Sequence, residues 1–208
     1  MDFRSLEISE LALPDVFLIS SRAVEDDVVV RYEAFREDCV EEAIGRPFAI
    51  RYSDLSVARR RVLRGIHGST GPDGRARLLC CVRGAAVHVV VDLRVGSPDY
   101  GRYETLWLDH RTAAGVFVPE GLGHAWLALE DDTVVACHSS RPYTAGAAYT
   151  VSALDPALAL PWGLTRAPVM TDDDLAAPTA AEALARGLLP AYEDCLALYA
   201  GSLPAATD

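Results

Sequence analysis

The residues of this chain that could carry out chemistry begin with one histidine, in the segment VLRGIHGST at residues 62–70. His67 ends an apolar, strand-like run, where an imidazole can fill space, ligate a metal or act as a base. The residues that follow it, GSTGP, offer no second ligand, and the acidic run TDDDL at residues 171–175 lacks the ligand spacing of a calcium loop. We therefore expect no metal site, which leaves proton transfer and a structural role.

Composition excludes several classes of function. The chain has 208 residues, a formal net charge of -11, and 24% charged against 50% hydrophobic residues. An excess of acids provides nothing to neutralise nucleic-acid phosphates, so we expect no nucleic-acid partner. Every basic residue other than histidine is arginine, so no lysine can form a Schiff base or contact a nucleotide phosphate as in a P-loop.

Cysteine usage and the N-terminal segment bear on the cellular compartment. Five cysteines form no CxxC pair, and Cys80 and Cys81 are adjacent, which favours a reducing environment. No basic start followed by an apolar core is visible at the N-terminus, and no apolar run approaches about 20 residues. We expect a cytoplasmic protein without a membrane partner.

Short runs rich in Val, Leu and aromatic residues dominate the middle of the chain, and Gly, Pro or Asp separates them. This spacing favours an antiparallel sandwich or barrel over βαβ units. The strands expected from these runs are 26–35, 48–55, 77–84, 85–96, 103–110, 115–121, 124–131 and 133–140.

Helical patterns lie towards the ends of the chain. Residues 36–45 fit a short helix, and residues 178–201 fit one or two helices interrupted near Gly187 and Pro190. Residues 154–178 carry four prolines, so we expect an irregular crossing loop there. Length and the absence of repeats favour a single domain over residues 1–208.

Four motifs in order, VLRGIH, VVVDLRVGSPDYGRYETLWLD, VPEGLGHAWLALED and LDPALALPW, resemble the dTDP-4-dehydrorhamnose 3,5-epimerase family over about residues 50–175. The resemblance implies an all-β cupin, a double-stranded β-helix jelly roll with short N- and C-terminal helices. It places the core at about 26–162, followed by a C-terminal loop and helices at 163–208, and it implies a homodimer.

The chemistry implied is cofactor-independent epimerisation of a nucleotide-linked 4-keto-6-deoxy sugar. A base removes the proton from the carbon beside the ketone, a cation stabilises the enolate, and an acid returns a proton to the other face. The resemblance assigns His67 as the base, Asp174 as its partner with Asp172 and Asp173 as competitors for that match, and Arg77 as the enolate stabiliser.

Counted back from Asp155, the catalytic tyrosine of the family falls on Cys137. A thiol can donate a proton, but its side chain is several ångströms shorter than a tyrosine. We therefore expect epimerisation at one centre, C3, rather than at two.

The resemblance also implies substrate-binding residues, with departures on the nucleotide side. Three of them match the pattern: Arg64 towards the diphosphate, His124 near the sugar and Tyr143 at the mouth. Three others lie in altered motifs: Glu33 in VVVRYE, Ser56 in YSDLS, and His88 at an aspartate position of the family. In YSDLS, Asp54 also places a negative charge where a diphosphate would approach.

Two other functions remain open at this point. The altered nucleotide-side residues favour a non-sugar isomerase or cyclase of a natural-product intermediate on the same fold. Loss of the tyrosine favours a non-catalytic cupin-like binding protein, whereas retention of both His67 and Asp174 opposes it.

Overall fold

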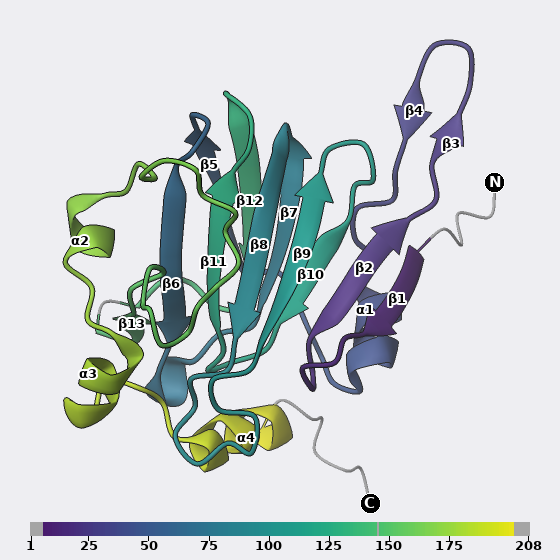
Figure 1. Cartoon of the computed structure of the whole chain (residues 1–208). Coiled ribbons are helices and arrows are strands. Elements are labelled where there is room, and N and C mark those ends of the chain that lie inside the picture. The colour runs from purple at the N-terminus through teal and green to yellow at the C-terminus, as the bar shows by residue number, and fades with distance from the viewer. Residues whose placement is uncertain (1–5, 145, 202–208) are drawn as a thin grey trace, which may run out of the picture.

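The structure is a computed structural model that describes residues 6–144 and 146–201. Two antiparallel sheets face each other, and the chain passes repeatedly from one to the other (Figure 1). The six-stranded sheet has the order β1 (Leu6–Glu10), β2 (Phe17–Ser21), β10 (Gly115–Val118), β7 (Arg77–Arg83), β12 (Thr133–Ser139) and β5 (Tyr52–Ala58). The five-stranded sheet has the order β13 (Ala148–Thr150), β6 (Leu63–Ser69), β11 (Gly123–Ala128), β8 (Ala85–Val91) and β9 (Tyr103–Asp109).

This architecture confirms the predicted jelly roll with an all-β core. Side chains that alternate along each strand fill the space between the sheets, including Leu79, Val90, Leu108, Val116 and Val135. Burying each such side chain contributes about 1.5–3 kcal/mol. The hydrophobic interior therefore holds the two sheets at a fixed separation.

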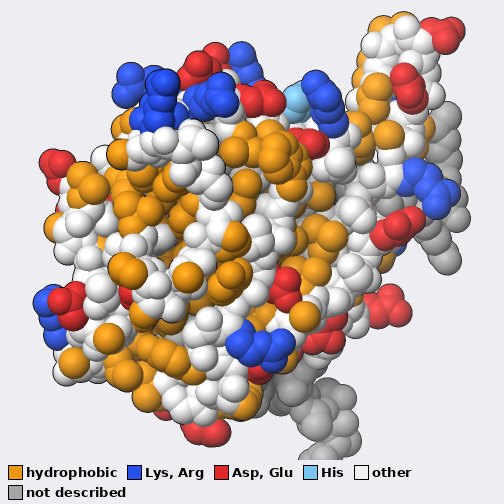
Figure 2. Space-filling model, in the orientation of Figure 1, with side chains coloured by type: hydrophobic (Ala, Val, Ile, Leu, Met, Phe, Trp, Pro, Cys, Tyr) orange, Lys and Arg blue, Asp and Glu red, His pale blue; other side chains and the backbone are white. Residues whose placement is uncertain are grey.

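Two further clusters cover the outer faces of the sheets. Helix α1 (Glu37–Ile44) contributes Val40, which packs with Phe48 and Phe117 on the six-stranded sheet. The C-terminal loop and helix α3 (Ala180–Ala185) bury Trp162 and Ala183 with residues from the five-stranded sheet. In Figure 2, hydrophobic side chains spread across the visible face, and arginines gather along its upper edge.

The N-terminal region departs most from the sequence-based expectation. The six-stranded sheet begins with β1 and β2, which lie before the expected core, and the expected strand at 26–35 was wrong. Only a two-residue pair forms there, β3 (Val24–Glu25) with β4 (Val30–Arg31), a projecting hairpin in Figure 1. The side chain of Asp26 accepts hydrogen bonds from the next two valine amides, at 2.9 and 2.8 Å, so the apolar run forms the turn instead of a strand.

The C-terminal region follows the expectation more closely. Helices α3 and α4 (Tyr192–Gly201) are separated around Gly187, as predicted. The crossing loop also contains one helical turn, α2 (Asp172–Leu175). Elsewhere in the chain, a 3₁₀ turn, η1 (Gly71–Asp73), precedes β7. Within the described part of the chain, no helix has the length and apolar character needed to span a membrane.

Candidate active site

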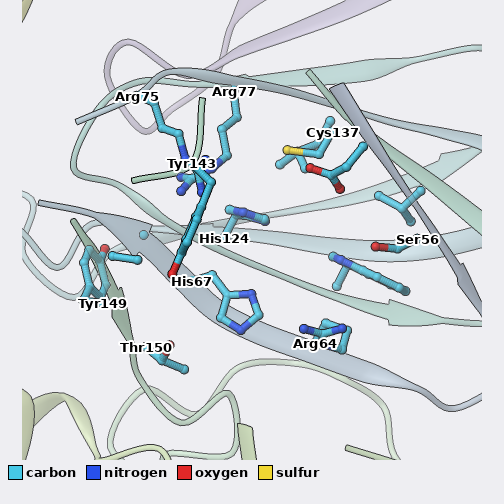
Figure 3. Close-up of a pocket in the computed structure, with 16 residues that line it drawn as sticks. Ser56, Arg64, His67, Arg75, Arg77, His124, Cys137, Tyr143, Tyr149 and Thr150 are labelled. Atoms are coloured by element: carbon cyan, nitrogen blue, oxygen red, sulfur yellow. The ribbon is translucent and has the colours of Figure 1, made fainter. Parts of the chain in front are cut away.

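A cavity of about 360 Å³ opens between the two sheets, beside the end of their shared hydrophobic core. Strands β6 and β11 provide one wall, and β5, β12 and β7 provide the opposite wall (Figure 3). The polar side chains that line it are Asp54, Ser56, Arg64, His67, Arg75, Arg77, His124, Cys137, Tyr143, Tyr149 and Thr150. The chemistry-bearing residues of the sequence therefore meet in one cavity.

A distortion of strand β6 turns two of its side chains into this cavity. Arg64 and His67 are three residues apart, so a regular strand would point them to opposite faces. Both line the cavity, because the pairing of β6 with β11 shifts register next to Gly65. Gly65 has φ +100°, and a Cβ there would lie 2.6 Å from the His124 carbonyl oxygen, so only glycine fits.

The crossing loop brings Asp174 to His67. Val169 forms a parallel bridge with Val62, immediately before β6, and its carbonyl accepts a hydrogen bond from Leu63 at 2.9 Å. Helix α2 follows directly, and Thr171 caps it by accepting a hydrogen bond from the Asp174 amide at 3.2 Å. These backbone contacts hold the loop against the strand that carries His67.

Three hydrogen bonds hold the Asp174 carboxylate, whose side chain is only 1% exposed. Its Oδ1 lies 2.6 Å from His67 Nε2, and its Oδ2 accepts from Arg64 Nε at 2.8 Å and from the Thr171 hydroxyl at 2.9 Å. Burial acts to raise the pKa of Asp174, but the hydrogen bonds from His67 and Thr171 and the nearby charges outweigh it. The pKa falls to about 2.

An ionised carboxylate determines which ring nitrogen of His67 carries the proton. Because Asp174 can only accept, Nε2 must donate, which leaves the lone pair of a neutral imidazole on Nδ1. The side chain is 31% exposed and lines the cavity, so this lone pair is accessible to a ligand. A neutral imidazole held in this way has the chemistry needed to accept a proton from a bound ligand.

His124 and His88 have different environments. The ring of His124 lies edge-on to that of His67, with centroids 6.3 Å apart, and burial lowers its pKa well below the usual range. His88 stacks near Trp126, outside the cavity lining; burial lowers its pKa to about 3, and neither ring nitrogen has a partner among the described residues. Both rings are therefore neutral at ordinary pH.

Two arginines on β7 and the turn before it face the cavity together. Arg77 is 3% exposed, and its Nη1 has no hydrogen-bond partner in the described part of the chain. Burial lowers the pKa of Arg77 to about 10, so the guanidinium remains charged at neutral pH. Arg75 stacks over the Tyr143 ring, 5.2 Å from its centroid. This corner is positive, and one of its donors is free for an oxygen ligand.

Cys137 lies at the centre of the wall opposite His67. It pairs with Leu79 on β7 and with Asp54 on β5, and Ser56 follows on the same face of β5. Its Sγ is 3.8 Å from the Ser139 hydroxyl. Burial raises the pKa of the Cys137 thiol, so it keeps its proton at neutral pH.

Most of the predicted site residues meet in this cavity. His67, Asp174, Arg64, Arg77, Cys137, Ser56, His124 and Tyr143 line it or contact a residue that does. The structure does not bring His88 or Glu33 to it. Glu33 lies before α1, where it forms an ion pair with Arg36 at 3.7 Å, and it is not among the residues that line the cavity.

Sequence reasoning missed Arg75 and Thr171. Arg75 stands two residues before Arg77, and this spacing on an extended chain could have indicated a shared face. Thr171 stands three residues before Asp174, the spacing of a helix N-cap and its N3 residue. Among the described residues, no cluster of three or more His, Cys, Asp or Glu side chains could hold a metal ion.

Comparison with known proteins gives consistent matches. Residues 10–182 match the sequence profile of the dTDP-4-dehydrorhamnose 3,5-epimerase family. A dTDP-4-dehydrorhamnose 3-epimerase from Streptomyces niveus is 39% identical over 93% of this chain and 93% of its own length.

Two solved structures are similar over nearly their whole length. NovW, a 4-keto-6-deoxy sugar epimerase from the novobiocin gene cluster of Streptomyces spheroides, has a TM-score of 0.88 and 38% identity over 91% of this chain and 95% of its own. The second structure is a double mutant of ChmJ, a 3'-monoepimerase from Streptomyces bikiniensis, in complex with dTDP. It has a TM-score of 0.89 and 33% identity, and the match covers 93% of this chain and 97% of the ChmJ chain.

Proposed function

This chain belongs to the dTDP-4-dehydrorhamnose 3,5-epimerase family, and from that premise we propose that it epimerises a nucleotide-linked 4-keto-6-deoxy sugar at C3 alone. The relatives are named as dTDP-sugar 3,5- or 3-epimerases. The observation that carries the proposal is the His67–Asp174 pair, held at 2.6 Å on the wall of the cavity.

The first step is removal of the C3 proton by His67. Nδ1 accepts the proton, the C3–H electron pair becomes the enolate π bond, and the ketone oxygen takes the negative charge. The imidazolium that forms is stabilised by the ionised Asp174 at Nε2. Arg64 and Thr171 hold that carboxylate, so the base keeps its orientation during proton transfer.

The enolate oxygen needs a cationic donor that is in place before the reaction. Arg77 supplies a buried guanidinium with an unpartnered Nη1 in the cavity. A preorganised donor of this kind stabilises the charge as it develops. Arginine stays protonated, so Arg77 acts as an electrostatic group and not as the acid.

The second proton transfer depends on the opposite wall. The ChmJ double mutant replaces a histidine and a tyrosine that are 70 positions apart, the same separation as between His67 and Cys137. The protonated thiol of Cys137 can return a proton to one carbon, directly or through one water. The resulting thiolate then regains a proton from solvent, and the His67 imidazolium releases its proton to solvent. In this chain the short side chain limits the transfer to a single centre, whereas ChmJ, a 3'-monoepimerase with a tyrosine at the matching position, must be limited by another feature.

Site-resolved deuterium exchange tests the proposal. The protein is incubated in D₂O with dTDP-4-keto-6-deoxyglucose, and NMR follows each carbon-bound hydrogen. We expect deuterium at C3 only. Deuterium at both C3 and C5 would refute the single-centre assignment, and no exchange together with no binding of dTDP would refute the sugar substrate.

We also propose that the protein is a homodimer. On the outer face of the six-stranded sheet, Leu55 and Val57 on β5 are 66% and 71% exposed, and Val82 on β7 is 53% exposed. Apolar side chains grouped at an exposed sheet edge are typical of a subunit interface. Light scattering should give twice the chain mass of 22.4 kDa, and a monomer would contradict the proposal.

A further inference from the structure

One carboxylate on the cavity wall has no role in the proposed proton transfers. Asp54 lies on β5 directly opposite Cys137 on β12, and both side chains line the cavity. Directly paired residues of antiparallel strands have Cβ atoms about 5 Å apart on the same face. Asp54 therefore stands beside the thiol, on the wall that faces His67.

The two carboxylates at this cavity differ in their contacts. Asp174 is buried and held by His67, Arg64 and Thr171. The carboxylate of Asp54 is exposed and makes no hydrogen bond or ion pair with the described residues. The protein thus provides a carboxylate acceptor on a ligand-facing wall, and a bound ligand can supply its partner.

The charge of Arg77 interacts with that of Asp54, but none of the positive groups in the cavity forms a hydrogen bond or ion pair with the Asp54 carboxylate among the described residues. Arg75 and Arg77 form one corner, and Arg64 lies beside His67 on the opposite wall (Figure 3). An anionic diphosphate is attracted to these arginines and repelled by Asp54. A ligand that carries both a diphosphate and a separate cationic group matches this division of charge.

We propose that Asp54 makes this site selective for sugars that carry a protonated amino group, an inference that rests on the proposed epimerase function. The ammonium would donate a charge-assisted hydrogen bond to the Asp54 carboxylate. A neutral hydroxyl at the same place gains less from a carboxylate, so the charge separates amino sugars from their hydroxyl counterparts.

Calorimetric binding tests this selectivity without turnover. The probes are dTDP-6-deoxyglucose and its 2-amino and 3-amino counterparts, all with a hydroxyl at C4, so that no proton is removed. We expect at least one amino sugar to bind about 10-fold more tightly than the hydroxyl sugar, the size of one charged hydrogen bond. Asp54→Asn, which removes the charge and keeps an acceptor oxygen, should bring that ratio close to one.

A matched control and the opposite outcomes complete the test. Asp132→Asn changes the net charge equally, at an exposed turn outside the cavity, and should leave the ratio unchanged. A wild-type ratio near one, or a ratio that Asp54→Asn does not change, overturns the inference. If C3 exchange is still observed in that case, the proposed function stands alone. If none of the probes binds and no exchange occurs, both proposals fail.

Discussion

The two walls of the cavity differ in how completely their polar groups are satisfied. On the β6 wall, His67 and Arg64 both contact Asp174, and the Thr171 hydroxyl donates a third hydrogen bond to the Asp174 carboxylate. On the opposite wall, Asp54 has no partner among the described residues, and one nitrogen of Arg77 is also unpartnered. The first wall is preorganised by the protein itself, whereas the second leaves its hydrogen bonds to a ligand.

This difference separates the proposed chemistry of the base from the proposed choice of substrate. A base must have one orientation and one protonation state before the ligand arrives, which requires a closed hydrogen-bond network. A specificity wall must instead gain its partners on binding, since unpaired polar groups discriminate between ligands that satisfy them and ligands that do not.

Replacing the base should have the largest effect. His67→Asn keeps a polar side chain and removes the group that accepts the C3 proton, so we expect deuterium exchange to fall about 10⁴-fold. The matched control is His138→Asn, because His138 lies on the outer face of β12 with its ring bonded to Ser53. Equal exchange rates in the His67→Asn and His138→Asn variants would show that His67 is not the base.

Asp174→Asn should reduce exchange about 10³-fold, because an amide neither fixes the His67 tautomer nor stabilises the imidazolium. The neighbouring Asp173 is exposed, and Asp173→Asn should leave the rate within about two-fold. Rates for C3 exchange, measured by NMR, distinguish the two carboxylates. Equal losses in both variants would show that Asp174 has no special role.

On the opposite wall, Arg77→Met should lower the exchange rate about 10²-fold by removing the donor to the enolate oxygen. Arg77→Lys keeps the charge on a flexible side chain and should recover most of that loss. A thermal unfolding measurement checks that both variants fold. If the Arg77→Met and Arg77→Lys variants have the same exchange rate, the charge of Arg77 has no part in the reaction.

Cys137→Tyr should add hydrogen exchange at a second carbon, C5. A phenol reaches further from β12 than a thiol, so we expect exchange at C5 to appear at least about 10-fold above the wild-type background. Cys137→Ser, which is as short as the native side chain, serves as the control. Continued exchange at C3 alone in the tyrosine variant would show that reach does not limit the reaction to one centre.

The smallest effect concerns stability. The folded pKa of Asp174, about 2, lies below its ordinary value of 3.8, so the ionised form stabilises the fold above about pH 4. That contribution, about 2 kcal/mol, is lost as the pH falls towards 2. Denaturant unfolding of wild type and Asp174→Asn should therefore show a stability difference that shrinks over this range. A constant difference would contradict the assigned pKa.

The sequence predicted strands and site residues of both walls. Short runs rich in Val and Leu, separated by turn residues, predicted β7, β8, β9 and β12 within a few residues. His67 and Asp174 followed from the motifs of the resemblance, which lie far apart in the chain and meet through the crossing loop.

The missed features depend on details that strand patterns do not carry. The register shift at Gly65, which turns Arg64 and His67 to the same side, arises from pairing with β11 and not from β6 alone. The turn at Asp26 breaks an apolar run through side-chain hydrogen bonds to the backbone. The selectivity proposed for Asp54 depends on which strand lies opposite it, and only the sheet order of the folded chain reveals that.

The most direct test of the base assignment is a ¹⁵N NMR spectrum of the His67 ring at neutral pH. The contact between Nε2 and an ionised Asp174 requires the proton on Nε2 and a bare Nδ1 facing the cavity. We expect long-range ¹H–¹⁵N correlations of that tautomer in the wild type. A proton on Nδ1 would contradict the assignment, because no lone pair would then face the substrate.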